Sequence, residues 1–446
     1  MTAPATSAPD RGWFGHPRGL STLFFTEMWE RFSYYGMRGF LILYLTAAVT
    51  SGGLGFDVKD GARIYALYTS TVWLTPIVGG FIADRFLGQY RSVLIGGIII
   101  ALGHFTLAFH AVAFFYMGLA LIVIGTGMLK PNVSTLVGSL YEASDQRRDA
   151  GFSLFYMGIN IGAFLGITGA GYLAEKIDWH VGFAAAGVGM TLGLIQYVRG
   201  KGRLQVAIDR LAARPKETGP GMAVPTAVES LTATDWKRIA AIFVLFIFAA
   251  LFWGAYEQAG STLNLFADRN TDRVIFGWEM PASWLQAVQP VFVILLAPVL
   301  AWLWVRLGKR EPSSPAKFAL ALLFAGLAFL LLVPAASLAQ SGAGVKVSPL
   351  WLVLAYAIEE LGELCLSPVG LSAVTKLAPP RLVGRMMGVF FLSNWLGNLL
   401  AGWTAGFFSS MPLPTLFGAV AGVSLGAAAI MYVLLKPIRG LMGGVR

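Results

Sequence analysis

The sequence has 446 residues, of which 56% are hydrophobic and only 13% are charged, whereas soluble proteins carry about 25% charged residues. This balance excludes a soluble globular protein and indicates a polytopic membrane protein. The formal net charge of +10 does not indicate nucleic-acid binding, because no polar domain interleaves basic clusters with aromatic residues.

The first apolar run, residues 20–48, is long enough to cross a bilayer, which needs about 20 residues. It nevertheless contains four charged residues, each costing about 2.5–3.5 kcal/mol near a helix centre. On a helix they share an arc of about 100° with Tyr34. They are Glu27, Glu30, Arg31 and Arg38. The i,i+4 pair Glu27–Arg31 could serve only to neutralise charge during insertion, but an apolar helix is cheaper to build. We expect a function for this charged face.

Twelve membrane-spanning helices are predicted along the chain. Their expected ranges are 20–48, 61–84, 92–112, 114–140, 151–174, 181–199, 237–266, 282–305, 317–340, 349–375, 384–408 and 414–435. An even number of crossings places both termini on one side of the membrane. Of the 33 Lys and Arg residues, 24 fall in the termini and the even-numbered loops, so the positive-inside rule predicts that both termini are cytoplasmic. Residues 1–19 lack an apolar core and read as a cytosolic lead-in.

One long polar connection divides the predicted helices six and six. We expect an N-terminal bundle at 1–199, a partly helical cytoplasmic linker at 200–236 and a C-terminal bundle at 237–446. Two such halves indicate a transporter whose site lies between them at the bilayer midplane. The connection after the second helix, Gly79–Gly88, contains Asp84-Arg85 and resembles a loop signature of the major facilitator superfamily. That resemblance implies a lock between cytoplasmic helix ends, although an ordinary basic turn is an alternative.

Polar side chains recur inside the later helices, where lipid makes them costly. They are Tyr68, Lys130, Asn160, Trp253, Glu257, Glu359, Glu360 and Glu363. Tyr68 could be a core aromatic residue, and Asn160 could form only a helix–helix hydrogen bond. All intramembrane cations lie in the first half, and the second half offers only carboxylates. This distribution suits a substrate with a carboxylate at one end and an ammonium group at the other, and the spare carboxylates are candidates for carrying protons.

Four segments resemble signatures of the proton-dependent oligopeptide transporter family. Glu27-Met-Trp-Glu-Arg-Phe-Ser-Tyr-Tyr-Gly36 is similar to its first-helix motif, and Phe155–Gly162 is similar to its second signature. Phe252–Gln258 and Gly362–Pro368 match its seventh- and tenth-helix patterns. The matches keep the family's order and span both halves. The resemblance implies an all-α integral membrane protein with a major-facilitator-type fold of two six-helix bundles.

The same resemblance implies proton-coupled import of di- and tripeptides by alternating access. Arg31 and Lys130 would then hold the peptide carboxylate, and Glu363 its amine. Other implied peptide contacts are Tyr35, Tyr68, Asn160, Trp253 and Gln289. Proton coupling would involve Glu27, Glu30, Arg31 and Glu257, and Arg38 would pair with Glu257 as a gate between the halves.

The chain departs from the family pattern in three places. The connection 200–236 is too short and polar for the two additional helices of many bacterial members. Gln289-Pro290 stands where Asn often precedes Pro, which leaves the contact of Gln289 open. Phe390 stands where Trp is frequent, which leaves the size of the side-chain pocket open.

Three other functions are alternatives: an exporter of hydrophobic cations, a carrier of another anion such as nitrate, and an integral-membrane enzyme. Nitrate would leave Glu363 without a partner, and an exporter would have little use for Arg31 and Lys130. An enzyme is disfavoured because Cys365 is the only cysteine and the four histidines lack metal-ligand spacing. We therefore expect no enzyme activity, no cofactor and no metal. The expected partners are small peptides, protons and the lipid bilayer, without nucleic acid, for a monomer in the cell inner membrane.

Overall fold

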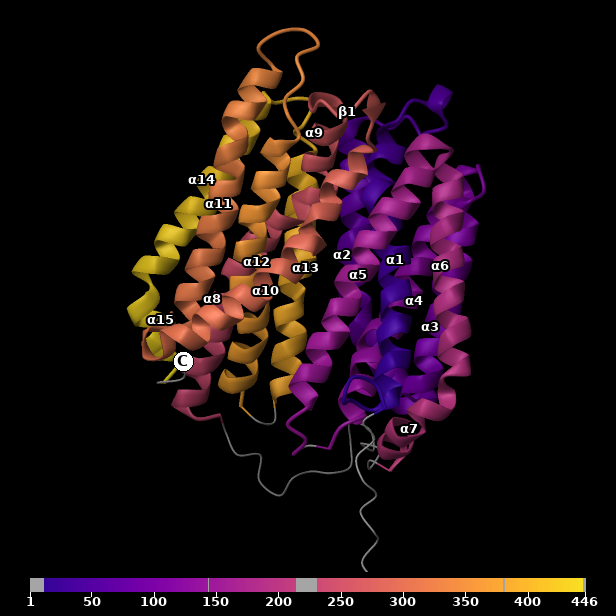
Figure 1. Ribbon diagram of the computed structural model, residues 1–446. Helices are drawn as coiled ribbons and strands as arrows, with labels where there is room; N and C mark the ends of the chain where they lie inside the picture. Colours follow the sequence, from indigo (N-terminus) through magenta and orange to yellow (C-terminus); the bar gives the residue numbers. More distant parts are fainter. Residues whose placement is uncertain (1–11, 143, 214–230, 380–381, 444–446) are drawn as a thin grey trace, which may run out of the picture. The chain divides into compact units, whose positions relative to one another are not determined.

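The computed structural model describes residues 12–142, 144–213, 231–379 and 382–443, and helices account for most of them (Figure 1). The long helices are α1 (Arg18–Thr46), α2 (Val58–Ile82), α3 (Gln89–Leu107), α4 (Val112–Ser139), α5 (Arg148–Lys176), α6 (Trp179–Arg199), α8 (Ala233–Tyr256), α10 (Val288–Leu307), α11 (Ser314–Ala339), α12 (Leu350–Leu377), α13 (Val383–Ala405) and α14 (Leu413–Val433). The short helices are α7 (Gln205–Ala212), α9 (Thr262–Asn270) and α15 (Leu435–Leu441). Short helical turns are η1 (Val49–Ser51), η2 (Ala83–Leu87), η3 (Lys201–Leu204), η4 (Glu257–Gly260), η5 (Ala282–Ala287) and η6 (Gly308–Arg310).

Every predicted membrane span coincides with one of the long helices. Within the described residues, nine helical segments are both long and apolar enough to cross a membrane. The remaining three long helices are α1, α12 and α13, with 29, 28 and 23 residues. Helices α1 and α12 are less apolar because they carry the charged residues singled out in the sequence. The all-α membrane architecture expected from the sequence is therefore correct.

The seventh span differs in detail from its prediction. Helix α8 ends at Tyr256, and the 3-10 turn η4 joins it to α9, which continues to Asn270. The sequence predicted one uninterrupted helix over 237–266. The interruption falls at Glu257, so it places this carboxylate at a turn and not within a regular helix.

A short hairpin follows α9 in a connection for which the sequence predicted no regular structure. Strands β1 (Val274–Ile275) and β2 (Trp278–Glu279) pair antiparallel. The residues between them, Phe276 and Gly277, have φ angles of 51° and 80°. Two successive positive φ angles are typical of the tight turns that suit the twist of a hairpin.

The described residues form two compact units. The first contains Met1–Tyr35, Thr75–Gly166 and Phe183–Thr218. The second contains Gly36–Leu74, Ile167–Gly182 and Gly219–Arg446. Four long helices therefore contribute to both units. The division into two six-helix bundles follows a different line along the chain and stays a prediction. Of the predicted linker 200–236, η3 and α7 are helical, and residues 214–230 lie outside the described part.

Within the first unit, α5 packs closely against α1 through glycines four residues apart. A Cβ atom at Gly162 would overlap the backbone carbonyl of Met28, and one at Gly166 would overlap that of Phe32. Small residues at this spacing let two helix backbones approach within a membrane. This contact fixes the face of α1 that carries Arg31, because the Cβ of Arg31 also lies beside Gly162.

Candidate functional site

The first unit holds a buried charge cluster on α1. The Nε atom of Arg31 lies 2.7 Å from Oε1 of Glu27 and 2.8 Å from Oε2 of Glu30. The three residues are only 4%, 2% and 0% exposed, respectively. The i,i+4 spacing brings Glu27 and Arg31 onto one face of the helix, as expected from the sequence. In both ion pairs the guanidinium atom that lies against the carboxylate is Nε.

Lys130 adds a second cation to this cluster. It lies on α4, and its charge acts on Glu30. Pro131 follows directly inside the same helix. Since proline has no N–H to donate, it releases one backbone carbonyl beside Lys130. Two cations and two carboxylates thus balance one another in the first unit.

Tyr35 and Asn160 also belong to the first unit. The Tyr35 hydroxyl interacts electrostatically with Arg31. Asn160 is 7% exposed, and its Nδ2 donates to the Tyr156 carbonyl 3.0 Å away, one turn earlier on α5. Because this bond lies within α5, it does not support the alternative in which Asn160 forms only a helix–helix hydrogen bond.

The second unit holds the ion pair between Arg38 and Glu257. Nη2 of Arg38 binds Oε2 of Glu257, and Nε of Arg38 donates to the Tyr65 hydroxyl 2.9 Å away. The side chains of Arg38 and Glu257 are 13% and 6% exposed. Gly260 makes room for this arrangement, since a Cβ atom there would overlap the Tyr65 hydroxyl. This buried ion pair is supported by a further hydrogen bond to Tyr65. Removing one partner would leave the other charge buried and unpaired, which destabilises the protein.

Trp253 and Tyr256 form an aromatic edge on α8. Their ring centroids are 5.4 Å apart, and the rings are nearly perpendicular. The backbone at Trp253 lies so close to α13 that a Cβ atom at Gly397 would overlap the Trp253 Cβ. The indole Nε1 has no hydrogen-bond partner among the described residues.

Helix α12 supplies the remaining candidate carboxylates. Glu359 and Glu360 are 0% exposed and Glu363 is 6% exposed. The Tyr256 hydroxyl donates to Oε1 of Glu360 over 2.8 Å. Gln289 is the second residue of α10 in the same unit, and its buried Nε2 has no hydrogen-bond partner in the described part of the chain. Tyr68, on α2, is likewise buried.

Helix α1 is also fastened to α9 and η5 in the second unit. The carbonyl oxygen of Gly39 accepts from Nδ2 of Asn264 over 2.7 Å and from Nε2 of Gln286 over 3.1 Å. All three residues are buried or nearly so. Two side-chain amides on one backbone carbonyl fix the position of α1 against both neighbours, because each carbonyl has two lone pairs.

Helix α5 is fastened to η5 through three positions on one face. The Thr168 carbonyl accepts from the Trp284 indole over 2.9 Å, and a Cβ atom at Gly171 would overlap the Ser283 hydroxyl. Glu175 then accepts from the backbone N–H groups of Ala282 and Ser283, over 2.6 and 3.0 Å. The spacing of three and four residues is that of one helix face. We call these contacts of α1 and α5 with α9 and η5 the closed end.

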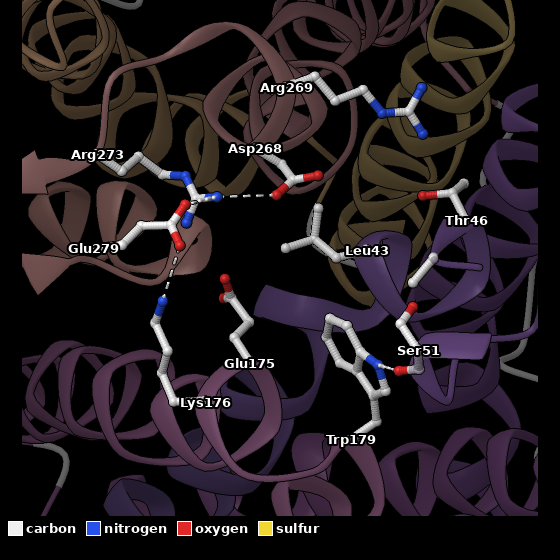
Figure 2. Close-up of a pocket in the computed structure, with 11 residues that line it drawn as sticks. Leu43, Thr46, Ser51, Glu175, Lys176, Trp179, Asp268, Arg269, Arg273 and Glu279 are labelled. Carbon is white, nitrogen blue, oxygen red and sulfur yellow. Dashed lines mark hydrogen bonds and ion pairs between the residues drawn. The ribbon is translucent and has the colours of Figure 1, made fainter. Parts of the chain in front are cut away.

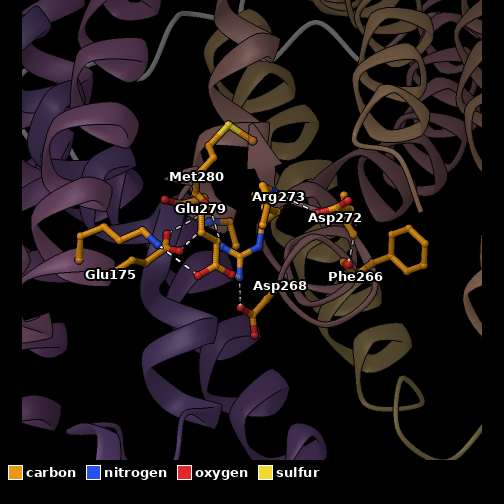
Figure 3. Close-up of polar contacts among 12 residues, drawn as sticks. Glu175, Phe266, Asp268, Asp272, Arg273, Glu279 and Met280 are labelled. Carbon is orange, nitrogen blue, oxygen red and sulfur yellow. Dashed lines mark hydrogen bonds and ion pairs between the residues drawn. The ribbon is translucent and has the colours of Figure 1, made fainter. Parts of the chain in front are cut away.

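A charged pocket of about 330 Å³ lies beside the closed end (Figure 2). Its charged lining residues are Glu175, Lys176, Asp268, Arg269, Arg273 and Glu279. Arg273 binds Asp268 over 3.2 Å and Glu279 over 3.1 Å, and donates to the Met280 carbonyl over 2.6 Å (Figure 3). Lys176 reaches Glu279 over 3.5 Å. These pairs hold the hairpin β1–β2 next to the end of α5.

The sequence did not reveal the residues of the closed end. Glu175, Asn264 and Gln286 are polar residues near predicted helix ends, where polar side chains are common. The only available signal was the spacing of Thr168, Gly171 and Glu175, and it identifies a face without naming its partner. By contrast, the structure brings together Glu27, Glu30, Arg31 and Lys130 in the first unit, and Arg38 and Glu257 in the second. The functional roles of these residues stay predictions.

The sequence profile described as "POT family" matches residues 90–208 and 216–420 of this chain. The chain belongs to the POT family. Relatives of this POT protein include "Uncharacterized transporter YclF" of Bacillus subtilis, 41% identical over 98% of each chain. "Peptide transporter YePEPT" of Yersinia enterocolitica is 38% identical over 99% of this chain and 98% of the relative. The crystal structure of peptide transporter POT in complex with sulfate covers 98% of both chains at 41% identity, with a TM-score of 0.88.

A second solved structure is that of a POT family transporter in complex with 5-aminolevulinic acid. It covers 96% of this chain and 98% of its own at 32% identity, with a TM-score of 0.85. The POT family and these relatives are transporters. The chain is therefore an integral membrane transport protein with the fold of its family, as the four sequence signatures predicted.

Proposed function

We propose that this POT family member is a proton-coupled symporter that imports di- and tripeptides by alternating access. The observation that carries the proposal is the buried cluster of Arg31, Glu27 and Glu30 beside the half-buried Lys130, in a chain with peptide-transporting relatives. Besides YePEPT, these relatives include "Di-/tripeptide transporter" of Lactococcus lactis, 34% identical over 98% of this chain and 99% of the relative. The two ends of a peptide also match the two kinds of charge found in the membrane helices.

In this proposal the peptide carboxylate binds Arg31 and Lys130. Arg31 meets both neighbouring carboxylates through Nε, and guanidinium groups bind carboxylates strongly through two parallel hydrogen bonds. Glu363 binds the peptide amine. The proposed contacts with the peptide backbone and side chains are Tyr35, Tyr68, Asn160, Trp253 and Gln289.

Charge balance supplies the reason for proton coupling. With two cations and two carboxylates ionised, the cluster of the first unit is neutral before substrate arrives. A peptide carboxylate adds one negative charge, and an uncompensated charge within a membrane protein is costly. Protonation of Glu30 restores neutrality and frees Arg31 for the peptide. One proton and one peptide therefore enter together, with Glu27 keeping its ion pair to Arg31.

The Arg38–Glu257 ion pair acts as a gate in this cycle. The excess of Lys and Arg in the terminal and even-numbered loops favours cytoplasmic termini. With that orientation the loop after α1 is extracellular, and so is the closed end. Opening this end to admit a peptide requires that Arg38 and Glu257 separate, and protonation of Glu257 lowers the cost of separation. In this proposal the protein works in the cell inner membrane as a monomer.

Uptake of labelled dialanine into proteoliposomes tests the proposed function. An inward proton gradient should drive accumulation, and unlabelled dialanine should compete whereas free alanine, nitrate and a lipophilic cation should not. If accumulation of dialanine did not depend on the proton gradient, coupling between proton and peptide transport would be contradicted. Strong competition by nitrate or by the lipophilic cation would instead favour another solute.

The orientation of the peptide is tested with N-acetyl-dialanine. Loss of one charge-assisted hydrogen bond costs about 1.5–3 kcal/mol, or about ten- to a hundredfold in affinity. Acetylation should weaken binding to the unmodified protein by this factor and should matter little to Glu363→Gln. An equal effect on both proteins would show that Glu363 does not bind the amine.

A further inference from the structure

Helix α12 carries a buried carboxyl group to which the proposed cycle gives no role. Glu359 is 0% exposed, and neither of its oxygens has a hydrogen-bond partner among the described residues. Its neighbour Glu360 is equally buried but accepts a hydrogen bond from Tyr256. Glu359 therefore differs from Glu360 in having, among the described residues, no donor to stabilise a negative charge.

An ionised carboxylate in such a place costs several kcal/mol, because neither water nor a donor replaces its lost hydration. The nearby ionisable groups make this cost larger. Glu257 on η4 is close enough for its negative charge to act on Glu359, and Tyr356 lies one turn earlier on α12. The Tyr356 hydroxyl also has no hydrogen-bond partner in the described residues, and Tyr65 of α2 acts on it.

Two cations of neighbouring helices are paired with other carboxylates. Arg38 of α1 pairs with Glu257, and Lys317 of α11 pairs with Glu311 over 2.5 Å. The ion pair of Arg38 neutralises one carboxylate only. If Glu359 were also ionised, the buried surroundings of the pair would carry a second negative charge with no counterion.

We propose that Glu359 must bind a proton before the Arg38–Glu257 ion pair can close this end of the transporter. In the closed arrangement the proton resides on the Glu359 carboxyl, which is neutral, and Glu257 is the ionised partner of Arg38. When the pair separates and water reaches α12, Glu359 releases its proton to water and becomes a carboxylate. No other bond forms or breaks. Proton binding at Glu359 and closure are thus linked, and each favours the other.

The linkage is measured without any peptide. Spin labels on Val49→Cys and Phe276→Cys report the opening of the closed end, because both positions are exposed in the second unit and flank the charged pocket. The native Cys365 is 1% exposed and remains unlabelled. Distances between the labels are recorded by electron paramagnetic resonance in lipid nanodiscs over a range of pH. The inference rests on the proposed function only in assuming that this end opens, so failure of peptide transport would not affect the result.

Over the pH range in which Glu257 stays ionised, closure of the unmodified protein should increase as the pH falls. One linked proton changes the equilibrium by about tenfold per pH unit. Glu359→Gln should favour the closed arrangement at high pH, and the slope of closure against pH should fall by about one proton, or tenfold per pH unit. Tyr356→Phe is the matched control, because it removes a neighbouring buried hydroxyl and keeps the carboxyl, and it should leave the slope unchanged. A slope that Glu359→Gln does not alter overturns the proposal.

Infrared spectroscopy provides a second measurement if Glu359→Gln fails to fold. A neutral carboxylic acid has a carbonyl band separate from the bands of carboxylates. Replacing Glu359 by Asp keeps a carboxyl group, and it should shift one neutral-acid band of the closed protein. If no such band changes, Glu359 is ionised in the closed arrangement and the proposal is wrong.

Discussion

Glu175 should contribute more to the closed end than any other charged residue of the pocket. Its carboxylate accepts two backbone N–H groups, from Ala282 and Ser283, at 2.6 and 3.0 Å. These N–H groups lie at the start of η5, where a helical turn has no partners of its own for them. In Glu175→Gln only one carbonyl oxygen remains, and an amide NH2 group replaces the other acceptor.

The substitution removes one charge-assisted hydrogen bond, which is worth about 1.5–3 kcal/mol. If the bond is made only in the closed arrangement, the equilibrium should shift toward opening by about ten- to a hundredfold. The adjacent pair Lys176–Glu279 provides a matched control. Its atoms are 3.5 Å apart and its side chains are 23% and 49% exposed, so Lys176→Gln should cost at most about 1 kcal/mol.

The spin-label pair at Val49 and Phe276 measures both variants under identical conditions. Glu175→Gln should populate the longer label distance, and Lys176→Gln should resemble the unmodified protein. Equal opening in the two variants would mean that net charge, and not the hydrogen bonds of Glu175, holds α5 to η5. No opening in Glu175→Gln would show that these bonds are made in both arrangements.

Three further predictions concern the buried charges and the close helix contact. Arg38→Glu and Glu257→Arg should each lower the free energy of unfolding by about 3–5 kcal/mol, because the partner stays buried and unpaired. Thermal stability and dialanine exchange should recover in part when both substitutions are combined. No recovery in the combined variant would argue against direct pairing. Gly162→Ala should destabilise the protein by about 1–3 kcal/mol through overpacking, whereas Gly422→Ala, with no atom within 4 Å of the added Cβ, should leave the unfolding temperature unchanged or slightly raised. Glu30→Gln should abolish proton-driven accumulation and preserve peptide exchange, and accumulation at the unmodified rate would contradict its role as a proton carrier.

Local features of the sequence determined the membrane helices and the positions of the charged residues inside them. Apolar runs of about 20 residues predict membrane helices because the bilayer leaves no water for exposed backbone groups. Glu27 and Arg31 meet because residues four apart share a helix face, which requires no knowledge of any other helix. The sequence also identified Arg38 and Glu257 as charged residues inside predicted membrane helices. Their pairing was predicted from the family resemblance.

The tertiary structure alone decided which polar groups fasten the helices together. Glu175 stabilises the closed end because its oxygens accept from two N–H groups more than a hundred residues away in the sequence. Glu359 is unusual because no donor faces it in the described residues. Glu359 lies within a predicted membrane helix and Glu175 lies directly after one, and sequence pattern identifies the hydrogen-bond partners of neither. The free energy of a buried polar group depends on the partners that other elements bring within hydrogen-bond distance, and helix packing fixes those partners.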